Sequence, residues 1–82
     1  MITGSQIRAA RTAIGWSGAD LSEISGVSLR TISTIEASNG LPDARISTVT
    51  KLKSALESAG IEFIGSPDDA PGIRIHTRPA QD

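Results

Sequence analysis

The chain has 82 residues, enough for one small domain but not for a second independent core. Eight basic side chains against nine acidic ones give a net charge of −1, so strong non-specific binding to a polyanion is not expected. Because the chain has no cysteine, disulfides and cysteine-based metal sites are excluded.

No N-terminal segment has the pattern of a secretion signal, and no apolar run approaches the ~20 residues that a membrane-spanning helix needs. We therefore expect a cytoplasmic protein without a membrane association. The single histidine, His76, has no cluster of carboxylates around it in the sequence, and no serine stands in a G-x-S-x-G motif. These observations favour a protein that is not an enzyme, with no catalytic residue, no metal and no cofactor.

The first predicted helix follows Thr3, which together with Gln6 has the spacing of a capping box. Its apolar residues recur at helical spacing and lie on one side, namely Ile7, Ala10 and Ile14. Gly15 ends the helix. On the opposite side, Arg8 and Arg11 are expected to be exposed, where they either contact phosphate or keep the helix soluble.

Two short helices joined by a tight turn are predicted between residues 16 and 38. Ser17 caps the first of them, which ends at Gly26, a residue that tolerates positive φ. Ser28 caps the second. An apolar residue before each cap is spaced to pack on one inside the helix, and these pairs are Trp16 with Leu21 and Val27 with Ile32. The predicted apolar faces are Leu21 with Ile24, and Ile32 with Ile35, so that Leu29, Arg30, Ser33 and Thr34 point outward.

The next helix is predicted after a loop that begins with Asn39-Gly40 and continues through Leu41-Pro42. Asp43 is the expected cap, and the helix runs to about Ala59, with Gly60 closing it. Its predicted apolar stripe consists of Ile46, Val49, Leu52, Leu56 and Ala59. Four amphipathic helices of this kind can bury one another's apolar faces around a small aliphatic core.

After residue 60 the sequence pattern changes from helical to strand-like. Residues 61–64 and 73–76 are short and rich in β-branched side chains, which predicts two strands of a β-hairpin. Residues 65–72, GSPDDAPG, are expected to form a long, loose loop between them. Residues 77–82 are expected to be a flexible tail. The predicted organisation is a helical domain over residues 1–60, followed by a hairpin over residues 61–76.

The two short helices carry a resemblance to a known family. Leu21, the run from Ser25 to Ser28, and the run from Thr31 to Glu36 resemble the lambda-repressor-like (XRE-type) helix-turn-helix family. The similarity is dense over about twenty residues and extends more weakly over roughly the first sixty. It implies a mainly α, four-helix lambda-repressor-like DNA-binding domain, to which this chain adds the hairpin. One departure is Gly18, which replaces a family glutamine that commonly touches the DNA backbone.

The resemblance also implies which residues meet DNA. Leu29, Arg30 and Thr34 take the positions that usually contact bases, while Ser28 and Thr31 take positions near phosphate. The full implied set is Ser17, Gly18, Ser28, Leu29, Arg30, Thr31, Ser33 and Thr34. Chemically, an arginine such as Arg30 can donate two hydrogen bonds to O6 and N7 of guanine, and a leucine can pack on a thymine methyl group. Glu36 is usually structural in this family, bonding to nearby backbone or to an arginine, and Trp16 is expected to pack in the core.

Two functions are compatible with these features. The first is a small bacterial or phage transcriptional regulator, a repressor, that binds double-stranded DNA as a homodimer held partly by the hairpin. In the alternative arrangement the hairpin folds back over its own helices as a lid. The second function is an antitoxin-type interaction module that binds a partner toxin and regulates its own promoter. The near-neutral charge and the added hairpin keep this second function open.

Overall fold

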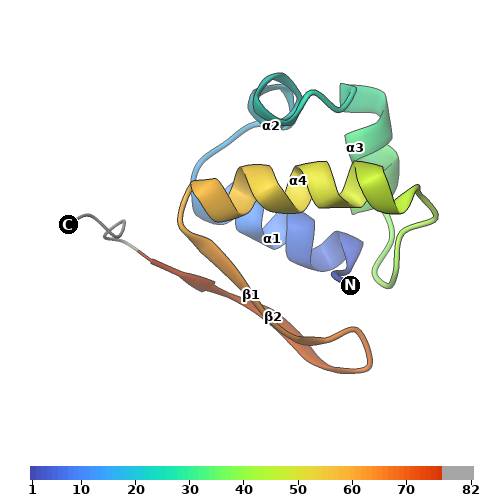
Figure 1. Ribbon diagram of the computed structural model, residues 1–82, viewed down its shortest axis with the longest axis vertical. Coiled ribbons are helices and arrows are strands. Elements are labelled where there is room, and N and C mark those ends of the chain that lie inside the picture. The colour runs from blue at the N-terminus through green and yellow to red at the C-terminus, as the bar shows by residue number, and fades with distance from the viewer. Residues whose placement is uncertain (77–82) are drawn as a thin grey trace.

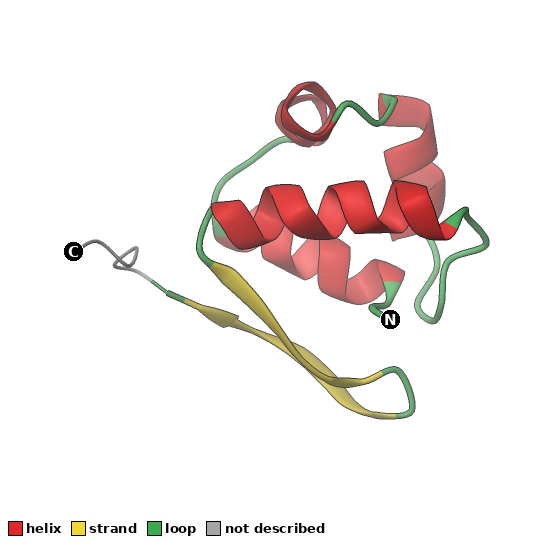
Figure 2. Cartoon of the chain, viewed as in Figure 1, coloured by secondary structure: helices red, strands yellow, loops and turns green. Residues whose placement is uncertain are grey.

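The computed structural model describes residues 1–76, which form four helices followed by a two-stranded antiparallel sheet (Figure 1). In chain order the elements are α1 (Gly4–Ala13), α2 (Gly18–Ser25), α3 (Leu29–Glu36), α4 (Ile46–Ser58), β1 (Ile61–Ser66) and β2 (Asp69–Ile75). Figure 2 shows the helices gathered together and the sheet lying along one side of them. The predicted mainly α architecture with a C-terminal hairpin is confirmed, and the tail predicted over residues 77–82 lies outside the described residues.

Side-chain caps begin the first three helices at the predicted positions. The Thr3 hydroxyl accepts a hydrogen bond from the Gln6 amide at 3.1 Å, and the Gln6 side chain accepts one from the Thr3 amide at 2.8 Å. Ser17 and Asp20 form the same reciprocal pair at the start of α2, and the Ser28 hydroxyl accepts from the amide three residues ahead in α3. Each cap contributes about 1 kcal/mol by satisfying an amide that has no partner within the helix.

The predicted start of α4 is wrong. The helix begins at Ile46 after Arg45, which makes no side-chain capping bond, while Asp43 is exposed in the preceding loop. Ile46 is also not part of the apolar face, because 70% of its surface is exposed. Side chains on a helix lean toward its N-terminus, so the first side chain of α4 extends beyond the helix rather than onto the core.

Every helix contributes aliphatic side chains to one core. The core residues are Ile2, Ile7, Ala10, Leu21, Val27, Ile32, Ile35, Val49, Leu52, Ala55, Leu56 and Ile61. Leu21 is the one buried residue of α2, and the predicted contribution of Ile24 is wrong, since 52% of its surface is exposed. Ile24 lies beside α4 at the rim of an open groove with Thr50 and Ser54, rather than beneath it. A helix as short as α2 buries only a narrow strip, so a residue slightly off its centre stays in solvent.

The start of α1 packs unusually closely against the end of α3. The Gly4 amide donates to the Gly40 carbonyl at 3.0 Å, and a Cβ atom on Gly4 would collide with the backbone carbonyls of Ile35 and Ser38. Only glycine permits this approach. The contact fixes where the loop after α3 leaves the helical bundle.

The hairpin is tighter than predicted. Instead of the loose loop expected over residues 65–72, both strands extend into that segment and leave Pro67 and Asp68 as the turn. The register irregularity between Ile64 and Ser66, with positive φ at Gly65 (76°) and Ala70 (54°), lets the strands bend toward a short turn. A sequence pattern does not reveal this, because a bulge changes the count of residues between paired positions.

The hairpin packs on the helices of its own chain. Ile61 is 3% exposed, and Phe63 and Ile73 pack against the core from the same face of the sheet. The Gln6 side chain of α1 donates to the carbonyls of Ile64 (3.2 Å) and Gly72 (2.8 Å), one on each strand. The arrangement in which the hairpin folds back over the helices is therefore the observed one. Within residues 1–76, no helix is long and apolar enough to cross a membrane.

Candidate nucleic-acid interface

The two short helices α2 and α3 meet through a turn of three residues, Gly26–Ser28. Gly26 ends α2 with φ at 79°, a left-handed conformation that glycine adopts without steric cost, and its amide closes the helix on the Ser22 carbonyl at 2.9 Å. Val27 is buried beneath the turn. In Figure 1, α2 is seen nearly end-on and α3 from the side, so the two helix axes lie well away from parallel.

One face of α3 is open to solvent. Ile32, Ile35 and Glu36 are buried, whereas the four residues predicted to point outward are all exposed, namely Leu29, Arg30, Ser33 and Thr34. This face combines one cation, two hydroxyl groups and one aliphatic side chain, and 48% of the surface of Leu29 is exposed. Such a set can donate and accept hydrogen bonds and offers one apolar contact.

The hydroxyl groups at the start of α3 are partly engaged with each other. The Ser28 hydroxyl donates to the Thr31 hydroxyl at 2.9 Å while it accepts the Thr31 amide, and the Thr34 hydroxyl donates to the Arg30 carbonyl at 3.1 Å. Thr31 is half-buried, so its side chain contributes less surface than the others. All three hydroxyl oxygens keep free acceptor capacity, and the donor hydrogens of Ser28 and Thr34 are already in use, whereas the Thr31 hydroxyl only accepts.

The start of α2 lies directly against the start of α3. A Cβ atom on Gly18 would come within 2.8 Å of Cδ1 of Leu29, so these two predicted residues are in contact. Ser17 precedes Gly18 and is exposed. The structure thus brings the predicted residues of α2 and α3 onto one continuous surface. It also shows that the Leu29 side chain occupies the space beside the position where the family has glutamine.

Two residues of this surface were not predicted from the sequence. Arg45 and Thr48, at the start of α4, line an open groove of about 380 Å³ together with Arg30 and Thr34 of α3. Asp43 also lines the groove, so one carboxylate shares it with the two arginines. Arg45 had a usable signal, because it is a cation in the loop that follows α3, but an expected helix start at Asp43 placed it inside the helix.

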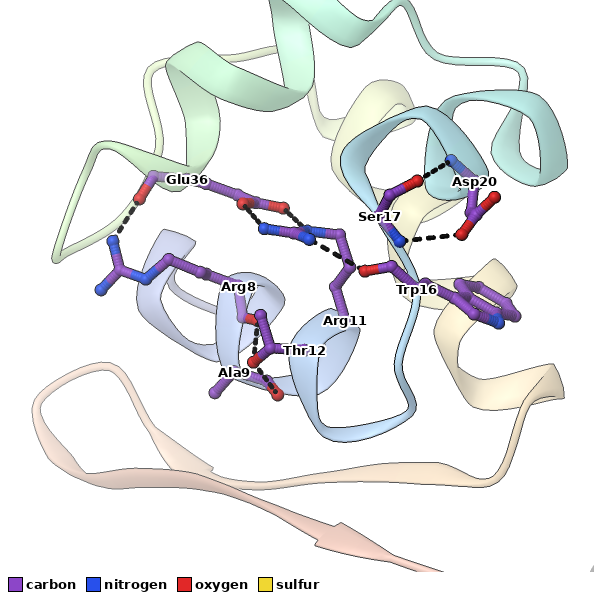
Figure 3. A network of polar contacts seen from close by, with 8 residues as sticks. All are labelled: Arg8, Ala9, Arg11, Thr12, Trp16, Ser17, Asp20 and Glu36. Carbon is purple, nitrogen blue, oxygen red and sulfur yellow. Dashed lines mark hydrogen bonds and ion pairs between the residues drawn. The ribbon is translucent and has the colours of Figure 1, made fainter.

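The interior side of α3 is held to α1 by a buried ion pair (Figure 3). The Arg11 guanidinium donates to both carboxylate oxygens of Glu36 at 2.8 and 2.9 Å, and to the Trp16 carbonyl at 2.9 Å. The side chains of Arg11 and Glu36 are only 17% and 9% exposed. Arg8 adds a bond of 3.0 Å to the Glu36 carbonyl, near the end of α3.

This network changes the interpretation of the α1 arginines. Arg11 is neither a free phosphate contact nor a solubilising surface charge. Its hydrogen bonds to Glu36 raise the pKa of Arg11 above its ordinary value; partial burial opposes the rise and the negative charge of Glu36 adds to it. The predicted structural role of Glu36 is confirmed. Trp16 is half-buried and packs against the core as expected.

Among residues 1–76, no group of three or more histidine, cysteine, aspartate or glutamate side chains is placed to hold a metal ion. No model of a known protein family matches the sequence, and no match is found among curated proteins. The resemblance to the helix-turn-helix family therefore rests on the motif residues themselves.

Proposed function

We propose that this protein binds double-stranded DNA sequence-specifically, as a small bacterial or phage transcriptional regulator of the lambda-repressor-like helix-turn-helix family. The observation that carries the proposal is the exposed polar face of α3, supported from behind by a buried core and by the Arg11–Glu36 pair. A helix is about 10–12 Å across with its side chains, which matches the ~12 Å width of the major groove.

In this proposal α3 enters the major groove with its first turn nearest the bases. Arg30 donates two hydrogen bonds to O6 and N7 of guanine, and Leu29 packs on a thymine methyl group. Ser33 and Thr34 lie on the same exposed face and contact bases or sugar at its edge. Contacts of this kind, rather than contacts to phosphate, supply sequence preference.

The surrounding residues supply the phosphate contacts. The first turn of α2, which follows Ser17 and begins at Gly18, leaves backbone amides without partners inside the helix, although the Ser17 amide itself is bonded to Asp20. Helix N-termini favour phosphate. At the start of α3, beside Ser28, the Thr31 hydroxyl donates to a phosphate oxygen, because within the described residues it only accepts a bond from Ser28. Arg45 lines the same groove as Arg30 and contacts the DNA backbone beside it. The short supply of cations on this surface predicts modest affinity for DNA of unrelated sequence.

Selection of bound sequences from a random duplex pool tests the proposal. We expect an enriched motif for the wild-type chain and a change in the base preference at one position for Arg30→Ala. If the wild-type chain enriches no motif while remaining folded, the proposed function is wrong. Capture of a protein partner in place of DNA would instead support the antitoxin-type module.

A further inference from the structure

The two-stranded sheet has no third strand beside it in the part of the chain that the structure describes. Within residues 1–76 the sheet consists of β1 and β2 alone, so each strand has one edge that pairs with no other strand of these residues. Such an edge presents a row of unpaired amides and carbonyls that can pair with another strand.

The register identifies which groups face outward on β2. The His76 amide donates to the Gly60 carbonyl at 2.8 Å, and Ile61 is paired with Ile75. In an antiparallel ladder this bond makes Ile61 and Ile75 a pair without mutual hydrogen bonds, and the alternation makes Phe63 and Ile73 another. The amides and carbonyls of Ile73 and Ile75 therefore point away from β1, toward the free edge.

At the end of the hairpin where Ile61 pairs with Ile75, β2 is more exposed to solvent than β1. Ile61 on β1 is 3% exposed beneath the helices, whereas its cross-strand neighbour Ile75 is 46% exposed. Arg74, the one cation of β2, is already paired with Glu62 at 3.3 Å across the hairpin. Pro71 removes a donor only near the turn. Between Pro71 and Ile75 the edge thus lacks the free charges that commonly prevent strands from associating, and the carboxylate of Asp69 lies beside the turn.

We propose that β2 of one copy pairs antiparallel with β2 of a second copy, which joins two hairpins into one four-stranded sheet. The two-fold axis passes between the paired Ile73 residues, which exchange both of their backbone hydrogen bonds. Each Ile75 amide donates to the Pro71 carbonyl of the second copy, so the missing proline donor costs little. Ile75 and Pro71 then lie side by side and cover each other's apolar surface.

The register follows from charge and from the proline. Moving the two-fold axis by one residue, from Ile73 to Arg74, would place Arg74 directly opposite Arg74 of the second copy, and like charges in that position are destabilising. In the proposed register Arg74 instead faces Gly72 of the second copy, where no side chain competes for the space. Association of this kind needs no DNA. Its failure would therefore leave the proposed function uncontradicted, and the reverse also holds.

Light scattering and sedimentation equilibrium of the full chain without DNA test the association. We expect the mass of two chains for the wild type at micromolar concentrations and the mass of one chain for Ile75→Lys. Ile24→Lys is the matched control, because Ile24 is similarly exposed (52%) but lies on α2, and it should keep the mass of two chains. A wild type that stays a single chain overturns the proposal, as does dissociation by Ile24→Lys but not by Ile75→Lys.

Amide hydrogen exchange on the wild type tests the same proposal without any variant, and so remains decisive if Ile75→Lys does not fold. We expect protection of the Ile73 and Ile75 amides to rise with protein concentration, while that of Ile61 and Phe63 stays constant. Protection that rises at Ile61 and Phe63 instead would assign the contact to β1 and overturn the proposal.

Discussion

Removal of the Glu36 carboxylate should be among the most damaging single changes to this protein. In Glu36→Ala, the Arg11 guanidinium loses two charge-assisted hydrogen bonds of 2.8 and 2.9 Å and keeps only the one to the Trp16 carbonyl. Breaking a buried ion pair from one side costs about 3–5 kcal/mol, since the other charge stays buried without compensation. Because Arg11 retains one partner and 17% exposure, we expect a loss of about 2–4 kcal/mol.

Glu57→Ala is the control for this change. Glu57 also pairs with a cation, Lys53, but at 3.8 Å and with both side chains 46% exposed. Solvent screens such a pair, and its removal should cost less than about 1 kcal/mol. Both substitutions place alanine in a helix, so differences in helix propensity largely cancel between them.

Urea unfolding, followed by circular dichroism and by the fluorescence of the single tryptophan, measures the free energy of unfolding of both variants. The expected result is a large drop in the midpoint for Glu36→Ala with an unchanged m-value, which identifies a change in stability rather than in compactness. Of a total stability of about 5–15 kcal/mol, the predicted loss is a large share. Equal effects of Glu36→Ala and Glu57→Ala would refute the role assigned to the buried pair.

Three further predictions concern other parts of the molecule. Gly4→Ala should destabilise the fold by several kcal/mol, whereas Gly40→Ala, where an added Cβ meets no atom within 4 Å, should be nearly neutral in the same urea assay. The pKa of Glu62 is lowered, first by its hydrogen bond to His76 and then by the charge of Arg74. The ionised carboxylate therefore stabilises the hairpin at neutral pH, and this stabilisation is lost as pH falls through the lowered pKa. An NMR titration of the hairpin should therefore show it loosening in acid, and a Glu62→Gln variant should lack that response. Finally, DNA affinity should fall less steeply with salt than for a strongly basic regulator, and a slope that corresponds to about ten phosphate contacts would contradict the sparse cation surface.

Local signals in the sequence were sufficient for much of the fold. The caps at Thr3, Ser17 and Ser28 and the left-handed stop at Gly26 depend on residues only a few positions apart, so their chemistry can be recognised without the structure. The same holds for α3, because the helical repeat separates its buried residues from its exposed ones.

The errors occurred where distant parts of the chain decide the outcome. Asp43 has the chemistry of a helix cap, yet α4 begins three residues later, after Arg45. Ala44 instead packs against the core, in a loop segment that lines a groove together with α3. Ile24 and Ile46 satisfy an apolar repeat but lie where no other element covers them. Whether a position on a helix is covered depends on tertiary packing, which propensity and periodicity do not contain.

The candidate interface shows the same contrast between what local sequence signals predict and what tertiary packing decides. The residues of α2 and α3 were predicted together because they are close in sequence, and the contact between Gly18 and Leu29 joins them in space. Arg45 and Thr48 were missed because they reach this surface only through the path of the loop. Arg11 was misjudged for a related reason, since its partner Glu36 lies 25 residues away.

The most direct test of DNA recognition by α3 is a titration of the selected duplex with wild type, Arg30→Ala and Lys51→Ala. Lys51 is an exposed cation on α4 and lies outside the groove that Arg30 shares with Arg45, so it controls for the loss of one positive charge. We predict that Arg30→Ala weakens binding by about 1–3 kcal/mol and removes the preference at one base pair, while Lys51→Ala leaves that preference intact. Equal binding and equal base preference for all three proteins would contradict the proposed role of α3.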